Sequence, residues 1–349
     1  MKKTILFYVH MKDPTLFYTQ RFYINTKDLL ESLGYNVIVS HKIGDAWKLR
    51  YDGLFVFFYK IGVVAAFLSK LRGKKVFFYG GMDDLNKQTT PFFRYNATRL
   101  VVFLCVCLAD WCLVESKTDM NNLKKLFLHK LPRNIHYSPQ AIDLSLYQCD
   151  VTQKKNLFTT VCLLSERNIK RKGVDISLYY FCRLKHIPQF QDAKYIIMGR
   201  DLGGGSYLKK IISTLGLDDS VSLTGEIPDA KKIALLKASR YYFQLSHYEG
   251  FGLAALEAIA SNCLVIHTGE GGLSDTIADD GLLIDIGKFN YSLESINPDI
   301  LKLPSEIGTE FFDKWNLRSK QFDIPNRKEV FYNTIGKTLP TLKKNVLTT

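Results

Sequence analysis

The sequence predicts an α/β protein built of two doubly wound domains. Short apolar runs rich in β-branched and aromatic residues alternate with helix-length segments, which is typical of a parallel sheet covered by helices on both faces. This alternation stops at the polar stretch 148–156, which we interpret as a linker, and a second series begins at Leu157. With 349 residues, the chain is long enough for two complete hydrophobic cores. We therefore expect a first domain over residues 1–150 and a second domain that begins at 157.

The expected strands are short runs bounded by turn-forming residues or by helix-length segments. In the first domain they cover residues 4–9, 34–39, 53–58, 75–79, 113–114 and 135–136. In the second domain they cover residues 157–164, 195–199, 221–225, 241–245 and 264–266. A helix is expected over 253–259, because these residues are almost all good helix formers, and the tail 310–349 is helical in pattern.

Positive charge is concentrated in the first domain. Residues 1–150 carry 21 Lys and Arg against 12 Asp and Glu, a net charge of +9, and the remainder carries 26 against 22, a net charge of +4. A basic half can attract nucleic acid or the anionic face of a membrane. No nucleic-acid-binding motif accompanies the charge, so we expect no nucleic-acid partner and favour an anionic membrane surface. An ordinary solvated surface is the alternative.

The sequence contains no uncharged apolar run long enough to cross a bilayer. The longest candidate, 54–71, is interrupted by Lys60 and Lys70, and 100–108 is too short. The N-terminus has no small-residue cleavage site, which favours a first strand over a signal peptide. The seven cysteines form no C-x-x-C pair, as expected for buried thiols in a reducing compartment. We expect a cytoplasmic protein that binds the inner face of the cell membrane peripherally.

The most informative motif is the segment 249–257, which reads EGFGLAALE. A β-prone run precedes its Gly-x-Gly turn and a helix follows, a layout that aims free backbone N–H groups at an anion. Eight residues along a helix rise roughly 12 Å, so Glu249 and Glu257 cannot share one bond as a glycosidase pair does at about 5–9 Å. The spacing suits an elongated ligand with hydroxyls at both ends, such as a nucleotide sugar. The alternative is an ordinary amphipathic helix behind a glycine turn.

Further motifs surround this segment in a fixed order. They are Lys172-Gly173, Gly199, Gly225 and Gly271-Gly272. The ordered series resembles the C-terminal domain of retaining GT-B glycosyltransferases, specifically glycosyltransferase family 4, over residues 157–285. The resemblance implies a GT-B fold, in which two Rossmann-like domains face each other across a cleft. It also implies that the last helices cross back, so we assign about 325–349 to the first, acceptor-side domain and 157–324 to the nucleotide-sugar-binding domain.

The resemblance assigns a catalytic or donor-binding role to each matching residue. Lys172 matches a lysine that binds the diphosphate, and Arg167 matches an arginine before it, although Glu166 stands where the family has glycine. Lys170 and Arg171 are reserves, and a solvated basic loop is the alternative. Glu249 matches the glutamate close to the donor sugar, and Glu257 matches the one that holds the ribose hydroxyls as an acceptor-only carboxylate. The backbone of Gly250, Phe251, Gly252 and Leu253 would cradle the sugar and diphosphate, and Gly199, Gly225 and Ile227 would line the base.

The first domain departs from the family pattern. Residues 10–13 replace the usual paired glycines of the first loop, and 80–84 replace the usual His segment after the fourth strand. Asp83 is our candidate there to meet the sugar or acceptor, with a turn-forming Asp as the alternative. The chain contains no Asp-x-Asp, so the sequence indicates neither a metal nor the metal-dependent glycosyltransferase fold. Cations and a helix N-terminus must then neutralise the leaving diphosphate.

These features together predict a retaining, metal-independent glycosyltransferase. It would move a hexosyl or N-acetylhexosaminyl group from a UDP- or GDP-linked sugar to a glycan or lipid-linked glycan acceptor in surface polysaccharide biosynthesis, without a cofactor. One alternative is a GT-B disaccharide phosphorylase or synthase with a soluble acceptor. Another is a non-catalytic, glycosyltransferase-like binding subunit, which would normally have lost one of the two glutamates or the lysine. A nicotinamide enzyme is disfavoured, because no Gly-x-Gly-x-x-Gly follows the first strand.

Overall fold

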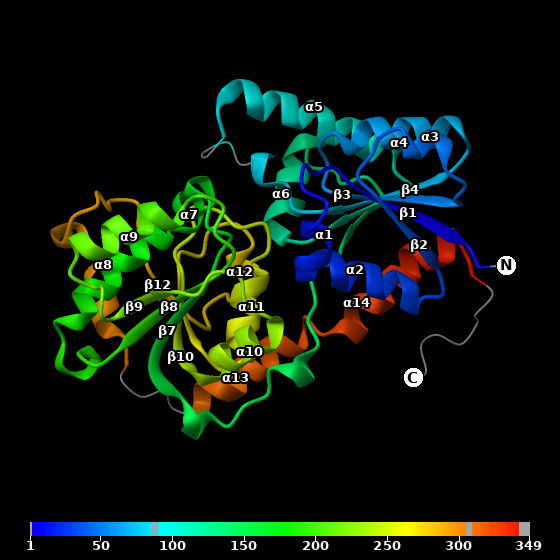
Figure 1. Cartoon of the computed structure of the whole chain (residues 1–349). Coiled ribbons are helices and arrows are strands. Elements are labelled where there is room, and N and C mark those ends of the chain that lie inside the picture. Colours follow the sequence, from blue (N-terminus) through cyan, green and yellow to red (C-terminus); the bar gives the residue numbers. More distant parts are fainter. Residues whose placement is uncertain (1, 86, 88–89, 305–308, 342–349) are drawn as a thin grey trace. The chain divides into compact units, whose positions relative to one another are not determined.

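The computed structural model describes residues 2–85, 87, 90–304 and 309–341. The chain divides into two compact units (Figure 1). The first unit comprises Met1–Ile142 and Phe322–Thr349, and the second comprises Asp143–Gln321. The chain thus enters the second unit before residue 150 and leaves it at 322, near the expected return at about 325.

The polar stretch 148–156 is not a linker, contrary to our expectation. The amine of Lys154 is buried in the second unit, where it donates to the carbonyl oxygens of Leu236 at 3.2 Å and Ser239 at 2.7 Å, and also to that of Ser261. Asn156 likewise donates to the carbonyl of Gln189, whereas Thr152 and Gln153 donate to Asp150 within the stretch. A break in hydrophobic periodicity was misread as a domain boundary, because such contacts satisfy polar residues without leaving an apolar pattern.

The first unit contains a parallel sheet with the strand order β2-β1-β3-β4-β5-β6 in its described part. The strands are β1 (Thr4–Val9), β2 (Asn36–Ser40), β3 (Gly53–Phe57), β4 (Lys75–Gly80), β5 (Trp111–Val114) and β6 (Ile135–Tyr137). Every residue of β3 is buried, as is typical of a central parallel strand with helices on both faces. Their positions match the sequence prediction to within about two residues, because such strands read as continuous apolar runs.

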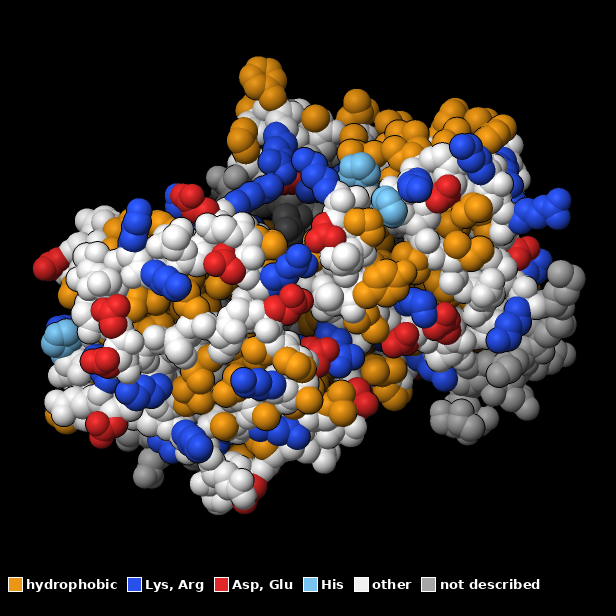
Figure 2. Space-filling model, viewed as in Figure 1, with side chains coloured by type: hydrophobic (Ala, Val, Ile, Leu, Met, Phe, Trp, Pro, Cys, Tyr) orange, Lys and Arg blue, Asp and Glu red, His pale blue; other side chains and the backbone are white. Residues whose placement is uncertain are grey.

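Helices cover both faces of this first sheet (Figure 1). The longer ones are α2 (Arg21–Ser32), α4 (Gly62–Leu71), α5 (Phe92–Leu108), α6 (Lys117–Leu126) and α14 (Ile324–Phe331), and two short ones are α1 (Leu16–Thr19) and α3 (Asp45–Lys48). One core lies under α4 and α5, and a separate core lies under α2 and α14. Hydrophobic side chains also gather on the outer side of α3, α4 and α5 (Figure 2). Among the described residues, no helix is both long enough and apolar enough to cross a membrane.

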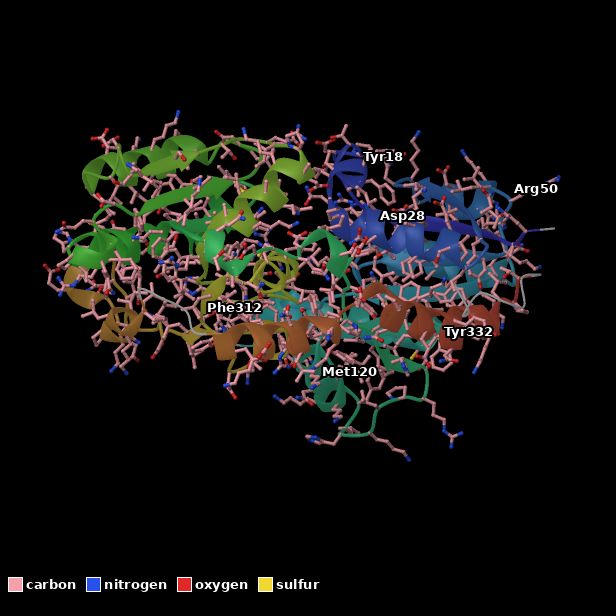
Figure 3. All side chains as sticks on the ribbon, turned by 90° about the horizontal axis from the view of Figure 1, so that it is seen from below. Tyr18, Asp28, Arg50, Met120, Phe312 and Tyr332 are labelled. Atoms are coloured by element: carbon pink, nitrogen blue, oxygen red, sulfur yellow. The ribbon has the colours of Figure 1, made fainter. Side chains whose placement is uncertain are left out.

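The described part of the C-terminal segment belongs to the first unit. Helix α14 packs against α2, and Figure 3 labels Asp28 on α2 and Tyr332, the residue directly after α14. Phe331 and Ile335 are fully buried in the core, and the hydroxyl of Tyr35 donates to the carbonyl of Leu339 at 2.7 Å. Residues 342–349, which we also assigned to this segment, lie outside the described residues.

The second unit contains a second parallel sheet with the strand order β12-β11-β10-β7-β8-β9 in its described part. The strands are β7 (Lys155–Val161), β8 (Lys194–Met198), β9 (Val221–Leu223), β10 (Ser239–Gln244), β11 (Leu264–His267) and β12 (Leu282–Leu283). The helices are α7 (Glu166–Lys172), α8 (Val174–Lys185), α9 (Gly205–Thr214), α10 (Asp229–Ala238), α11 (Leu253–Ala260), α12 (Leu273–Thr276) and α13 (Thr309–Lys320). Helices α8 and α9 cover one face, and α10, α11 and α13 cover the other (Figure 1).

Candidate functional site

The loops after the strands of the second sheet carry most of the predicted site residues. In a parallel sheet these carboxyl ends lie along one edge, where ligands of doubly wound folds bind. Four predicted glycines lie in these loops or, for Gly173, at the end of α7, and each packs so closely on another backbone that a Cβ has no room. A Cβ at Gly173, Gly199, Gly271 or Gly272 would lie 1.9, 1.8, 2.2 or 2.2 Å from the carbonyl oxygen of Leu245, Cys162, Glu249 or Gly250, respectively. Glycine is therefore required for the loops to meet.

Helix α7 and the glycine after it place Lys172. The helix begins after Ser165, whose Oγ accepts a hydrogen bond from the backbone N–H of Asn168 and so caps the first turn. It ends at Gly173, which has a left-handed conformation with φ 61°. Because Gly173 packs on Leu245 beyond the end of β10, the last turn of α7 lies beside the loop that carries Glu249. Lys172 thus ends a packed helix and does not lie in a solvated loop.

Glu249 is the centre of a cluster of donors at this edge. Its side chain is buried, and Lys172 Nζ lies 3.0 Å from its Oε1. The same oxygen accepts from the amide of Gln244 at 3.0 Å and from the hydroxyl of Ser246 at 3.5 Å. The other oxygen accepts from Arg171 Nη1 at 3.4 Å. The structure therefore joins two predicted residues, Glu249 and Lys172, and adds the reserve candidate Arg171.

The two cations determine the protonation state of Glu249. Burial on its own would raise the pKa of this carboxyl, but the charges and hydrogen bonds of Lys172 and Arg171 outweigh burial and hold the pKa below its ordinary value of 4.5. Glu249 is therefore ionised at neutral pH. The cluster of Glu249, Lys172 and Arg171 has one negative and two positive charges, so it keeps a net positive charge that favours an anionic ligand.

The turn after Glu249 leads into helix α11. Its first turn starts at Gly252, which has φ 89°, and no side chain in the described part of the protein caps it, so its backbone N–H groups can bind an anion. Two hydrogen bonds fix the turn: Gly272 N donates to the carbonyl of Glu249 at 2.7 Å, and the hydroxyl of Thr276 donates to that of Phe251 at 2.5 Å. Phe251 is buried, so it contributes backbone rather than side chain to this turn.

Glu257 lies within α11 and is held by two residues from distant segments. Lys232 Nζ lies 2.8 Å from both carboxylate oxygens, and the hydroxyl of Tyr147 donates to Oε1 at 2.8 Å. An ionised carboxylate offers about four acceptor positions. Described residues fill three of them, which leaves one position on Oε2. The carboxylate can therefore accept from one ribose hydroxyl while Lys232 balances its charge.

The remaining predicted residues lie around this edge without joining the Glu249 cluster. Gly199 N donates to the carbonyl of Gly225 at 3.1 Å, so the loops after β8 and β9 are joined, and Ile227 is half-buried just beyond them. Arg167 is exposed on the first turn of α7, one turn before Arg171 on the same side of the helix. Lys170 pairs with Glu166 and does not join the cluster.

Asp83 begins the 3₁₀ turn Asp83–Leu85 of the first unit, and its side chain lies outside what the structure describes. Its neighbour Asp84 is bound by Lys60 Nζ and Arg94 Nη2, each at 2.9 Å. Burial would raise the pKa of Asp84, but these two cations lower it below the ordinary value. Of the two neighbouring aspartates, Asp84 is thus the one whose carboxylate has defined ion-pair partners, Lys60 and Arg94.

Sequence reasoning missed Lys232, Tyr147 and Gln244 as neighbours of the two glutamates. Lys232 is one of several lysines on a polar helix, and Tyr147 directly precedes the stretch that we interpreted as a linker. Gln244 ends an apolar strand and offered a usable signal, because an amide at the end of a buried strand needs a partner.

The second unit matches a known family model. Residues 152–297 match the model described as glycosyl transferases group 1. The match includes Lys172, Glu249 and Glu257, and it covers less than half of the 349 residues.

Similarity to solved structures covers nearly the whole chain. The structure of Anabaena Alr3699/HepE in complex with UDP-glucose is similar with a TM-score of 0.71 and 17% identity, over 96% of this chain and 100% of that chain. The fold is GT-B. The GT-B fold class predicted from the sequence, with its two parallel α/β sheets, is thus confirmed.

Two curated relatives share parts of this GT-B chain. The MMP alpha-(1->4)-mannosyltransferase of Mycolicibacterium hassiacum is 27% identical over 43% of this chain and 35% of its own length. The phosphatidylinositol N-acetylglucosaminyltransferase subunit of Arabidopsis thaliana is 22% identical over 58% of this chain and 44% of its own length. The chain therefore matches less than half of the length of each relative.

Proposed function

We propose that the protein is a retaining, metal-independent glycosyltransferase of family 4. It transfers a hexosyl or N-acetylhexosaminyl group from a UDP- or GDP-linked sugar to a glycan or lipid-linked glycan acceptor in surface polysaccharide biosynthesis. The group 1 family match, the GT-B fold and the sugar-transferring relatives support this proposal.

One observation carries the proposal: Lys172 and Arg171 converge on the buried Glu249 beside the uncapped N-terminus of α11. Breaking the anomeric C–O bond of a nucleotide sugar leaves a diphosphate that gathers negative charge. Preorganised cations and helix N–H groups stabilise such a charge without a metal. Here the ion pairs with Glu249 hold both cations in place before a donor binds.

On the basis of the same geometry, we propose different tasks for the two glutamates. With the described residues counted, Glu257 keeps one free acceptor position on Oε2 for a ribose hydroxyl. Glu249 already accepts from four donors, so a sugar hydroxyl reaches it by replacing one of them. The contact with the Ser246 hydroxyl, at 3.5 Å, is the longest of the four. In the retaining mechanism that the family resemblance implies, the acceptor attacks from the face of the leaving group, and the departing phosphate takes its proton.

Matched lysine variants test the proposal. Lys172→Met removes one of the two cations that contact Glu249. Lys170→Met removes an exposed lysine on the same helix that pairs with Glu166 and lies over the Tyr207 ring, away from the Glu249 cluster. We expect Lys172→Met to lower sugar transfer and binding of the nucleoside diphosphate, and Lys170→Met to change neither. Losing a charge-assisted hydrogen bond costs about 1.5–3 kcal/mol, which corresponds to roughly 10- to 150-fold in affinity.

The substrate screen distinguishes the alternatives. A thermal-shift screen with UDP- and GDP-sugars identifies the donor, because a ligand that binds the folded state raises the unfolding temperature. Donor binding with no transfer to any glycan acceptor and no slow hydrolysis would indicate a non-catalytic binding subunit. Cleavage of a disaccharide that requires inorganic phosphate would indicate a phosphorylase.

A further inference from the structure

We propose that the outer faces of α4 and α5 in the first unit form a docking surface for an anionic lipid bilayer. We call this surface the apolar face. It consists of Ile61, Val64, Phe67 and Leu71 from the α4 segment and of Phe92, Phe93, Leu100, Phe103 and Leu104 from α5. The inference goes beyond the proposed function, because bilayer binding is measured without donor, acceptor or turnover.

The outer side of α4 carries large apolar residues where a surface helix normally carries polar ones. Ile61, Val64, Phe67 and Leu71 follow one another at spacings of three and four residues, so they form a single stripe. Each of these side chains is between 43% and 61% exposed. The opposite side of the helix, with Ala65 and Ala66, is buried in the core. Helix α4 is therefore apolar on both sides.

Helix α5 repeats this arrangement. Val102, Cys105 and Val106 are its buried side, whereas Phe93, Leu100 and Leu104 are between 42% and 86% exposed. The only charged residues of this helix are two arginines, Arg94 and Arg99. A contiguous stripe of exposed aromatic and aliphatic side chains is uncommon on a helix that faces water, and it usually marks an interaction surface.

The two stripes belong to one surface. Helix α4 packs against α5 and also against α3, which adds the half-exposed Trp47 at its border. Figure 2 shows hydrophobic side chains gathered over α3, α4 and α5 on the outer side of the first unit. Exposed apolar side chains with bulky aromatic rings are what a protein inserts into the boundary between lipid headgroups and acyl chains.

The charge around the apolar face is positive. Residues 53–109 contain eight Lys and Arg, namely Lys60, Lys70, Arg72, Lys74, Lys75, Lys87, Arg94 and Arg99, against Asp83 and Asp84. Asp84 is shared by two cations, and Asp110 just beyond this segment is shared by Lys70 at 2.6 Å and Lys75 at 3.1 Å. Each of these acids leaves one cation in excess. These cations lie on α4 and α5 or close to them in the sequence, and we call them the cationic rim of the apolar face. Cations beside apolar side chains match anionic headgroups above acyl chains.

The charge also decides between a bilayer and a second copy of this chain. In a two-fold dimer the same patch lies on both partners, so residue i of one copy approaches the same region of the other. Two copies of the apolar face would therefore bring two cationic rims together, which costs free energy. An anionic bilayer meets both the apolar and the cationic part of the surface.

Vesicle co-sedimentation of the full chain tests the inference. We expect binding to vesicles of phosphatidylcholine with phosphatidylglycerol, weaker binding as salt screens the cations, and little binding to phosphatidylcholine alone. Leu100→Asp and Phe67→Asp place a charge in the apolar face, and each should lower the partition coefficient about tenfold or more. Leu317→Asp is the matched control, because Leu317 is 68% exposed on α13 of the second unit, and it should leave binding unchanged.

Thermal unfolding and nucleotide binding verify that each variant is folded. The nucleotide assay reports on the second unit, whereas vesicle binding reports on the apolar face of the first unit. The vesicle result can therefore be interpreted even if the proposed glycosyltransferase function is refuted. Absent binding to anionic vesicles at low salt, or equal binding by Leu100→Asp, Phe67→Asp and wild type, would overturn the inference. So would a wild-type dimer in sedimentation velocity that Leu100→Asp dissociates, because the apolar face would then be covered by a second copy.

Discussion

Replacing Gly173 by alanine tests the contact that places Lys172. The residue has φ 61°, a left-handed conformation that costs a non-glycine residue about 1–2 kcal/mol. In addition, the new Cβ would lie 1.9 Å from the carbonyl oxygen of Leu245, whereas ordinary contact begins at 3.4 Å. The carbonyl is backbone, and the backbone of residue 173 fixes the position of the Cβ, so no side-chain rotation can relieve the clash. Forced backbone shifts of this kind cost about 1–3 kcal/mol more. We therefore expect Gly173→Ala to destabilise the second unit by about 2–5 kcal/mol.

Gly216 provides a matched control on the same unit. It has φ 65°, close to that of Gly173, but nothing lies within 4 Å of its added Cβ. Gly216→Ala therefore carries the conformational cost without the clash, about 1–2 kcal/mol. The difference between the two variants isolates the close approach to Leu245.

Urea unfolding and calorimetry with the free nucleoside diphosphate measure the two consequences. Separating Gly173 from Leu245 moves the last turn of α7 away from Glu249, so Gly173→Ala should weaken nucleotide binding while Gly216→Ala leaves it intact. If the two variants had equal unfolding free energies and equal affinities, the glycine contact would not be what positions Lys172.

Three further predictions concern buried charge, pH and metal. Lys232→Met removes the cation that pairs with the buried carboxylate of Glu257, leaves it the hydrogen bond from Tyr147, and should cost about 3–5 kcal/mol of stability. Adding Glu257→Gln should recover part of this loss, and strictly additive losses in urea unfolding would contradict the pairing. Burial lowers the pKa of His267 from 6.5 to about 4. The unfolded chain therefore binds a proton there between these pH values that the folded chain does not, so stability is complete above pH 6.5 and falls as the pH drops towards 4. Between pH 7 and pH 5 the loss should be about 2 kcal/mol, and a His267→Gln variant with the same loss would refute it. Sugar transfer should persist in EDTA; activity lost there and restored by Mg²⁺ or Mn²⁺ would show a metal requirement.

The parts of the fold that depend on local pattern were predictable from the sequence. Strand β1 was placed at its observed residues, 4–9, because a buried parallel strand is a continuous apolar run between polar ends. The Lys172-Gly173 pair and the Glu249–Glu257 spacing were also readable, since each depends on a turn or a helix within a few residues.

The partners of the site residues were not predictable, because they come from distant segments. Lys232 is 25 residues from Glu257, and Tyr147 is 110 residues from it. A single sequence gives no sign of which of many lysines will meet a given carboxylate. The prediction for the stretch 148–156 failed for a related reason: the amine of Lys154 is bonded to backbone carbonyls that only the folded unit brings together.

The burial of the Lys154 amine makes this residue a chemical reporter of the second unit. Acylating reagents modify a lysine only when its amine is deprotonated and in contact with solvent, and this amine is surrounded by carbonyl oxygens. Exposed lysines such as Lys170 react in the folded chain, whereas Lys154 reacts only when this part of the second unit opens. The acylation rate at Lys154, followed by peptide mass spectrometry, therefore measures the opening of the second unit within the intact chain, separately from that of the first.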